Sequence, residues 1–313
     1  MTIEDSSQPQ RHLVVLFGAT ASGKTAAAVR AAQALPIEVV SADSRQIRRG
    51  MTIGTAAPTP GELAAVPHQL VGIVQPDAPW TITDWLDRAC AALDDIWARG
   101  KLPLLIAGTG HYAWSLLEGR SIPAVPPNPH LRAELEAFAA AEGATALHAR
   151  LEAVDAASTA RIEAANVRRV IRALEIVDAT GGPVPPLKNE APDFSWNAVG
   201  LRWPREELYG RTDARATAMY EAGLIEETRA LVGVHGDQFD ALESIGYAEA
   251  LHVLDGSWTQ DEAIARTQTA THRLVRMQDT WFRADDDRIG WFDGRNHRAV
   301  QEAIEGAAIP PVR

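Results

Sequence analysis

The segment Gly18–Thr25, GATASGKT, constrains the possible folds of this chain more than any other segment. It matches the pattern G-x-x-x-x-G-K-[ST], a turn whose backbone N–H groups surround a phosphate. The apolar, β-branched run His12–Phe17 before it predicts a buried strand, and Ala26–Ala32 after it predicts a helix. A glycine-rich turn that only closed a strand–helix unit would give no reason for the lysine. The segment therefore predicts a phosphate-binding unit in which Lys24 supplies positive charge and the Thr25 hydroxyl can hold Mg²⁺.

Strand and helix patterns alternate through the first third of the chain. Ile37–Ser41 predicts a second strand and Leu102–Ala107 a third, with a helix over Thr83–Arg99 between them. The Pro- and Gly-rich stretch before that helix predicts a loop with a short strand near 70–74. We expect the helix to bury one face, made of Leu86, Ala89, Cys90, Leu93 and Trp97. This alternation is typical of an α/β fold with a parallel sheet flanked by helices.

Two proline-rich linkers, at 122–129 and 180–186, bracket a segment of different character. Residues 130–179 between them are predicted to be wholly helical, which indicates an inserted subdomain. Residues 197–201 then resemble a strand that returns to the sheet, and 204–310 is mainly helical. We therefore predict a P-loop NTPase-like α/β fold with an all-helical insertion. Its predicted domains are a core from 11–121 and 187–313 and an insertion at 122–186.

The composition excludes several classes of protein. The chain has 313 residues, a net charge of −11 and one cysteine, Cys90, which excludes a disulfide framework and a multi-cysteine zinc site. The polar segment Met1–Gln10 does not resemble a signal peptide, and no apolar run approaches the ~20 residues of a membrane span. We expect a cytoplasmic protein with no membrane contact. The acidic balance argues against a nonspecific nucleic-acid coat.

Polar residues follow the second and third predicted strands. Asp43 lies just beyond the second strand, within SADSRQ, and Thr109 lies between two glycines beyond the third. Ligands of open α/β sheets bind at the carboxyl ends of strands, so Asp43 suits a magnesium ligand or a general base. The structural alternatives are a turn or N-cap aspartate and a tight strand-to-helix turn at Thr109. The third strand ends in AGT rather than in an acidic residue, which argues against a nucleotide-driven motor.

Arginines are grouped at three places. One group lies in VRRVIR and consists of Arg168, Arg169 and Arg172. A second forms a stripe along one predicted helix and consists of Arg266, Arg273, Arg276 and Arg283. The third, Arg211 and Arg215, suits a lid over a phosphate. Charged stripes are usually solvated faces, but beside a phosphate loop they also fit a track for an RNA backbone.

Apolar and aromatic residues complete the predicted C-terminal helices. Opposite the second arginine group we expect a packed face of Ile264, Leu274, Val275, Trp281 and Phe282. The tryptophans Trp114, Trp281 and Trp291 are expected in the core rather than as stacking platforms. The histidines show no metal-ligand spacing, so we assign them no ligand role.

Several segments resemble, in order, those of the tRNA dimethylallyltransferase family. They are GATASGKT (18–25), SADSRQIRRGMTIGTAAP (41–58), AGTGHY (107–112), NVRRVIRALEIVDATG (166–181), REELYGRTDARATAMYEAGLIEE (205–227), SIGYAEA (244–250) and THRLVRMQDTWFR (271–283). The first is shared by many phosphate-binding proteins, whereas SADSRQ followed by GTAAP is far more specific. The resemblance implies transfer of a dimethylallyl group from its diphosphate to the N6 amine of the adenosine at position 37, beside the anticodon of tRNA, with release of pyrophosphate.

The resemblance also implies roles for individual residues. Asp43 would be the general base, and Thr109 would orient the amine. The donor diphosphate would contact Gly18, Thr20, Ala21, Ser22, Gly23, Lys24, Thr25 and one or both of Arg211 and Arg215, with Mg²⁺ on Thr25. The flipped base and the rest of the tRNA would contact Asp43, Ser44, Arg45, Gln46, Thr109, Arg168, Arg169, Arg172 and Arg276. The implied partners are the tRNA anticodon stem-loop and dimethylallyl diphosphate, and we expect a monomer.

Four positions depart from the family pattern. Ala19 stands where the family usually has proline, Arg48 where it has tyrosine, Ala107 where it has glycine and His111 where it has leucine. Beside Thr109, His111 would change the polarity or the pH response of the site. With one cysteine the chain lacks the C-terminal zinc finger of many eukaryotic relatives and resembles the bacterial form.

Three other functions remain open on the sequence. An adenylate isopentenyltransferase would prenylate a free nucleotide, but the tRNA-type motifs and the helical insertion argue against it. A small-molecule kinase with a phosphate loop would need ATP turnover and a lid arginine. A catalytically silent RNA-binding relative would not need to keep Lys24, Asp43 and Thr109.

Overall fold

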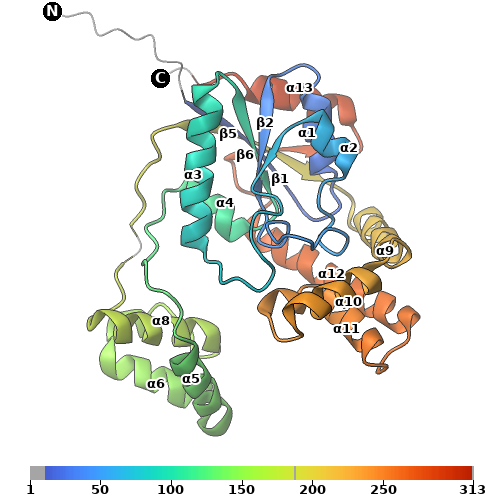
Figure 1. The fold of residues 1–313 in the computed structure, drawn as a ribbon. Helices are drawn as coiled ribbons and strands as arrows, with labels where there is room; N and C mark the ends of the chain where they lie inside the picture. Colours follow the sequence, from blue (N-terminus) through green and yellow to red (C-terminus); the bar gives the residue numbers. More distant parts are fainter. Residues whose placement is uncertain (1–10, 187, 312–313) are drawn as a thin grey trace, which may run out of the picture. The chain divides into compact units, whose positions relative to one another are not determined.

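The structure of this protein is a computed structural model that describes residues 11–186 and 188–311 (Figure 1). The predicted absence of a signal peptide falls on residues 1–10, which lie outside the described residues. The chain divides into two compact units. The core unit comprises the described residues up to Glu118 and from Ala191 onward, and the inserted unit comprises Gly119–Glu190.

A parallel sheet forms the centre of the core unit. Its strands are β1 (His12–Gly18), β2 (Ile37–Ala42), β3 (His68–Gln69), β4 (Leu102–Ala107), β5 (Ser195–Arg202) and β6 (Ile289–Asp293). They pair in the order β3-β2-β4-β1-β5-β6, and every pairing is parallel. The parallel sheet confirms the predicted α/β fold class.

Two details of the sheet differ from the prediction. The predicted short strand near 70–74 is wrong, because β3 lies at 68–69 and Leu70 takes a positive φ of 65° that ends the extended backbone. Val74 makes only an isolated bridge to Arg48. The edge strand β6 was not predicted, because the sequence was read as mainly helical over 204–310.

Helices cover both faces of the sheet (Figure 1). Helices α3 (Ile82–Ala98) and α4 (Gly110–Leu117) cover one face, and α1 (Lys24–Ala31) and α13 (His297–Ala307) cover the other, with α2 (Pro60–Ala65) beside α1. The predicted buried face of α3 is rotated. Its buried residues are Trp85, Ala89, Leu93 and Ile96, whereas Cys90 is exposed. The buried face includes the Trp85 indole, which donates to the Ser41 carbonyl at 3.1 Å.

A helical layer follows β5 in the core unit. It consists of α9 (Arg205–Glu221), α10 (Leu224–His235), the 3₁₀ turn η1 (Asp240–Glu243), α11 (Tyr247–Leu254) and α12 (Gln260–Trp281), around a separate apolar cluster. Helix α12 ends at Trp281, so the prediction that Arg283 belongs to the arginine stripe of this helix is wrong. The Arg283 guanidinium instead pairs with Asp285 at 2.8 Å.

The inserted unit is a small bundle with its own core. Its helices are α5 (Pro129–Glu142), α6 (Ala144–Val154), α7 (Ala156–Thr159) and α8 (Val167–Thr180), and residues 160–166 are not helical. Leu135, Leu147 and Leu151 pack against α8 in its core. None of the helices in the described part of the chain is long and apolar enough to cross a bilayer.

Candidate functional site

The strand order brings three segments to one edge of the sheet. Strand β4 lies between β1 and β2, and parallel strands present their carboxyl ends on the same side. The phosphate loop, residues 18–25, follows β1, and Asp43 follows β2. The Gly108 turn, residues 108–110, follows β4 between them. Residues far apart in sequence therefore meet here, as in the crevice where open α/β sheets bind ligands.

The phosphate loop has the backbone of an anion-binding turn. Gly18, Ala21 and Gly23 have positive φ values of 153°, 62° and 93°, and α1 starts at Lys24. A Cβ on Gly18 would lie 2.6 Å from Ser22 Oγ and 3.1 Å from the Leu201 carbonyl, so only glycine fits there. Such a turn directs amide groups and the positive end of a helix dipole toward one point.

Lys24 is held inside this loop. Its ammonium donates to the Gly18 carbonyl at 2.8 Å and to the Ala19 carbonyl at 2.9 Å. Burial lowers the pKa of Lys24 from 10.5 to about 8; Arg215 adds to this effect, and Asp43 opposes it. A bound anion would favour the charged form of this lysine.

Both predicted lid arginines contact the phosphate loop. Arg211 Nε donates to the Ala21 carbonyl at 2.9 Å, and its guanidinium lies 4.1 Å from the Trp203 ring. Arg215 donates to the Thr20 hydroxyl. Burial lowers the pKa of Arg215, although Asp43 opposes the shift. Helix α9 thus adds two positive charges to the edge of the loop.

The carboxylate of Asp43 is fixed through one of its oxygens. Asp43 Oδ1 accepts from the backbone amides of Arg45 at 2.8 Å and Gln46 at 3.2 Å. Its other oxygen faces Gly108, where an added Cβ would lie only 2.7 Å from Oδ2. The close approach requires glycine at 108 and leaves Oδ2 directed at the Gly108 turn.

Thr109 ties the ends of β4 and β2 together. Its amide donates to the Ala42 carbonyl at 2.8 Å. The Thr109 hydroxyl accepts from the Ser44 amide at 3.0 Å and donates to the Ser44 hydroxyl at 3.3 Å. Gln46 Nε2 donates to the carbonyls of Thr55 and Ala56, which anchors the SADSRQ segment to the loop behind it.

A cavity of about 350 Å³ joins these groups. Its polar lining includes Thr20, Asp43, Ser44, Thr109 and Arg215. Its apolar lining includes Ala216, Met219, Leu274, Met277 and Trp281. Trp281 packs partly buried against the core, as predicted, but it also lines this cavity and stacks on His111 with ring centroids 6.0 Å apart, which was not predicted. Trp114 is buried as predicted, and Trp291 packs partly buried against the same core.

Of the remaining predicted tRNA contacts, only Arg45 lines the cavity. Arg45 lines the cavity and is exposed, while Arg276 on α12 donates to the Tyr209 hydroxyl at 3.1 Å. Arg168, Arg169 and Arg172 lie on α8 of the inserted unit. The first two are exposed, but Arg172 donates to the Val125 carbonyl at 2.6 Å and pairs with the buried Glu175.

Three of the departures from the family pattern have defined contacts. Arg48 donates to the carbonyls of Gln75 at 3.0 Å and Ala78 at 2.5 Å, so it fastens the loop before α3. Ala19 packs against Leu208 and Val275, and His111 stacks on Trp281 as described above. Ala107 is buried at the end of β4.

Sequence reasoning missed two residues that organise the site. Gln278 of α12 links the phosphate loop to the Gly108 turn through its carboxamide. Glu227 of α10 accepts from the amide of Ile53 at 3.0 Å and from the hydroxyls of Thr52 and Tyr247, both at 2.5 Å. Both lie in segments that carried the family resemblance, but their spacing along the helices gives no sign of their partners.

A parallel sheet with a phosphate loop at its carboxyl edge defines the P-loop class of phosphate-binding proteins. Sequence profiles place the chain more narrowly, because the family described as IPP transferase matches residues 46–285 and that described as isopentenyl transferase matches 11–69. A tRNA dimethylallyltransferase of Roseiflexus sp. (strain RS-1) is 46% identical over 274 residues, covering 87% of this chain and 90% of the relative. One from Herpetosiphon aurantiacus is 41% identical and covers 96% of both chains.

Solved structures agree with the sequence comparisons. The full-length tRNA isopentenylpyrophosphate transferase of Bacillus halodurans superposes with a TM-score of 0.69 at 35% identity, covering 96% of this chain and 97% of that one. The chain therefore belongs to the IPP transferase family of tRNA dimethylallyltransferases. The predicted family, fold class and enzyme class are confirmed.

Proposed function

We propose that this protein transfers the dimethylallyl group of dimethylallyl diphosphate to the N6 amine of adenosine 37, beside the anticodon of tRNA, and releases pyrophosphate. The observation that carries this proposal is the convergence of the phosphate loop, Asp43 and Thr109 on one cavity with an apolar wall. A prenyl diphosphate needs both a cationic end for its phosphates and an apolar surface for its hydrocarbon. The acceptor amine needs a base within reach.

The phosphate loop would hold the diphosphate as a leaving group. Lys24, Arg211 and Arg215, together with the loop amides, would neutralise the charge that develops on pyrophosphate as the C–O bond breaks. The same stabilisation acts more strongly on the departing pyrophosphate than on the bound donor, which is the condition for raising kcat.

Mg²⁺ fits the chemistry of this loop. Among the described residues no group of three or more His, Cys, Asp or Glu side chains is arranged to hold a metal ion. A divalent ion here would instead bind the Thr25 hydroxyl and the diphosphate oxygens, a ligand set that Mg²⁺ accepts in phosphate loops. Bound there, it would supply further positive charge to the leaving group.

Asp43 and Thr109 would act on the acceptor. The Asp43 carboxylate, held at Oδ1 and directed through Oδ2 toward the Gly108 turn, would take a proton from N6 as the new C–N bond forms. The Thr109 hydroxyl would orient the amine. Ser44, Arg45 and Gln46 would contact the flipped nucleotide and its neighbours, because a base taken out of the stack is read at its exposed edges.

The rest of the tRNA would meet arginines outside the cavity. We propose that Arg168, Arg169, Arg172 and Arg276 contact the tRNA, with the first three on an inserted unit that helps to hold the RNA. We propose further that the enzyme acts in the cytoplasm as a monomer on the anticodon stem-loop.

One set of incubations tests the reaction. The purified protein is given dimethylallyl diphosphate and Mg²⁺ with an unmodified tRNA bearing adenosine 37, with AMP, or with ATP and small-molecule acceptors, and products are identified by mass spectrometry. We expect prenylated adenosine in the tRNA alone. Prenylation of AMP without prenylation of tRNA would show that the acceptor is a free nucleotide and would contradict the proposal. ATP-dependent phosphorylation would indicate a kinase.

The role of Asp43 is tested in the same assay. Asp43→Ala should lose most of the transfer activity, because the residue would take the proton from N6 during the reaction. It should retain tRNA binding in a filter assay, because most of the affinity for tRNA comes from other contacts. Asp87→Ala, which removes an exposed carboxylate from α3, is the matched control. Full activity of Asp43→Ala would contradict the assignment of the base.

A further inference from the structure

The carboxamide of Gln278 joins two segments of the active site just beyond the point where the pairing of β1 with β4 ends, at Phe17 and Ala107. Its Oε1 accepts from the Thr20 amide in the phosphate loop at 2.8 Å. Its Nε2 donates to the Gly108 carbonyl in the Gly108 turn at 2.9 Å. Gln278 is 7% exposed, so loss of these hydrogen bonds would leave its buried polar atoms without water partners, which costs free energy.

Both ends of this bridge are next to reacting groups. Thr20 also receives the Arg215 guanidinium on its hydroxyl, and it lies in the loop that would hold the diphosphate. Gly108 lies against Asp43 Oδ2 and directly precedes Thr109. The carboxamide of Gln278 therefore connects the donor side of the cavity to the acceptor side.

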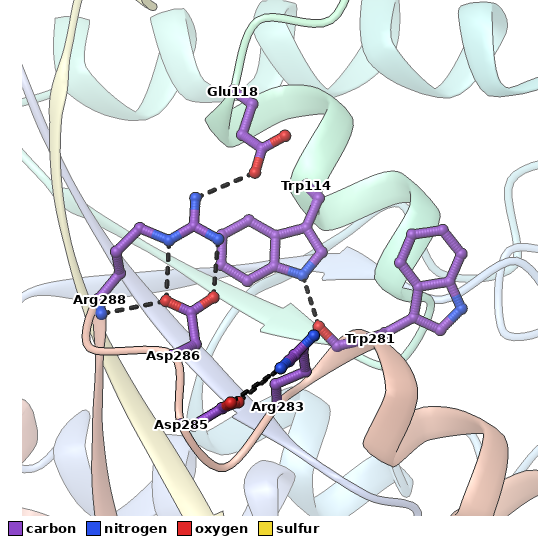
Figure 2. Close-up of polar contacts among 7 residues, drawn as sticks. All are labelled: Trp114, Glu118, Trp281, Arg283, Asp285, Asp286 and Arg288. Atoms are coloured by element: carbon purple, nitrogen blue, oxygen red, sulfur yellow. Dashed lines mark hydrogen bonds and ion pairs between the residues drawn. The ribbon is translucent and has the colours of Figure 1, made fainter. Parts of the chain in front are cut away.

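The helix that carries Gln278 is anchored at its last turn (Figure 2). The Trp114 indole of α4 donates to the Trp281 carbonyl at 2.9 Å. The Arg288 guanidinium lies 4.2 Å from the centre of the Trp114 ring and pairs with Asp286 at 2.7 Å and Glu118 at 3.0 Å. The Phe282 amide bonds back to the Gln278 carbonyl at 2.9 Å, so these contacts hold the turn that begins at Gln278.

Gly110 allows the end of α12 to pack closely against the start of α4. A Cβ at this position would lie 2.4 Å from Cβ and Cγ of Trp281, so the end of α12 packs directly on the Gly108 turn. With the backbone of α12 fixed in this way, the carboxamide of Gln278 has little freedom to follow movements of either partner.

We propose that Gln278 is a positioning residue that sets the spacing between the phosphate loop and the Gly108 turn, and hence between the prenyl donor and the acceptor amine. This inference rests on the proposed function. In-line transfer depends steeply on the separation of the reacting atoms, and a misplacement of about 1 Å costs on the order of 100-fold in rate. The bridge would therefore act on kcat more than on the binding of either substrate.

Two substitutions separate positioning from a general structural role. Gln278→Met keeps the length of the side chain and removes both hydrogen bonds; we expect kcat to fall about 10- to 100-fold with the KM for dimethylallyl diphosphate and for tRNA within about threefold of the parent. Gln268→Met, the same change on the same helix, removes only a bond to the Asp213 carbonyl and should leave kcat unchanged. Thermal unfolding of both variants checks that each is folded, and we expect a cooperative transition for both.

Gln278→Glu gives a readout that a packing role would not produce. A carboxylate at this position still accepts from the Thr20 amide, but it repels the Gly108 carbonyl until it takes up a proton and becomes a donor. We expect the ratio of its kcat to that of the parent to rise as the pH is lowered from 8 to 6, whereas the ratio for Gln278→Met stays constant.

The outcomes distinguish this inference from the proposed function. A parent enzyme that does not prenylate tRNA would overturn the function itself. An active parent whose kcat is matched by Gln278→Met, or a Gln278→Glu ratio that does not change with pH, would overturn the role of Gln278 and leave the function standing.

Discussion

Lys24 is held by two carbonyls of its own loop, at 2.8 and 2.9 Å, so its ammonium is already placed for a phosphate. The depressed pKa of about 8 measures the cost of keeping that charge in a buried position. A rise in pH should therefore have opposite effects on two quantities, the affinity for the diphosphate and the stability of the free protein. Diphosphate binding requires the charged lysine, whereas folding of the free protein favours the neutral one.

The affinity for dimethylallyl diphosphate should fall as the pH rises through about 8, since Lys24 of the free enzyme loses its proton there. Above that pH we expect a loss approaching about tenfold per pH unit. Calorimetric titrations at pH 7, 8 and 9 check this, and Lys24→Met should bind weakly with little change across the range. An equal Kd for the parent at pH 7 and 9 would contradict the expectation.

The same shift affects the free energy of unfolding with the opposite sign. The unfolded chain keeps this proton up to about pH 10.5, whereas the folded free enzyme loses it near 8. Between these two values the unfolded state binds more protons, so the free energy of unfolding rises with pH as the destabilisation by the buried Lys24 charge is relieved. The lysine therefore favours donor binding at neutral pH and destabilises the empty loop at the same pH.

At the scale of elements, the site depends on helices that come from the far end of the sequence. Helix α10 holds the loop after β2 through Glu227, and Gln46 binds that loop through the Thr55 and Ala56 carbonyls. The Glu227 carboxylate accepts from three backbone amides and two hydroxyls, and hydrogen bonds to a carboxylate are individually stronger than neutral ones. The loop behind SADSRQ is thus fixed by a side chain from a helix far along the chain; the bonded residues Thr52 and Glu227 are 175 positions apart.

Glu227→Gln should lower the free energy of unfolding by about 2–3 kcal/mol, because the amide that replaces one oxygen cannot accept from these donors. Glu226→Gln is the matched control. Its carboxylate is exposed and lies 3.6 Å from Arg229, so we expect a change within about 0.5 kcal/mol. Urea unfolding of the three proteins is the measurement, and equal midpoints for Glu227→Gln and the parent would contradict the role of this carboxylate.

The elements differ in how far the sequence predicts them. Strands β1, β2 and β4 were predictable because they are short apolar runs next to glycine or polar turns, and their shared carboxyl edge follows from parallel pairing alone. Asp43 and Thr109 were predictable for the same reason. Strand β6 was not, because Gly290 and an exposed edge position weaken its alternation. Gln278 could not be predicted because its partners depend on where α12 crosses the sheet edge, which only the tertiary packing determines.

At the scale of the whole molecule, the acidic chain places its arginines in different settings. On the inserted unit, Arg168 is exposed, whereas Arg172 lies between the Val125 carbonyl and the buried Glu175. Glu175 also pairs with Arg132 at 2.8 Å. The two arginines lie one turn apart on α8; Arg168 lies at the surface, whereas Arg172, in addition to its proposed tRNA contact, holds together the fold of the unit.

Arg168→Ala should weaken tRNA binding and reduce the slope of log Kd against log salt by about 1, with donor binding unchanged. Arg172→Ala should instead lower the unfolding temperature of the protein, because it leaves the Glu175 carboxylate with one cation fewer. Arg298→Ala, on α13, is the control for an exposed helical arginine. Identical salt slopes for Arg168→Ala and the parent would indicate that Arg168 is only solvated surface.

The position of β1 in the sheet has a consequence for how the protein is made. Among the described strands this one is synthesised first, yet it pairs with β4 on one side and with β5, which starts at Ser195, on the other. A nascent chain therefore carries its phosphate loop long before it carries Arg215 or Gln278. The helices of the inserted unit are local in sequence and can form in the meantime. Under the proposed function, a chain cut short before Gln278 would lack part of the donor site, so such a product of translation would not consume the prenyl donor.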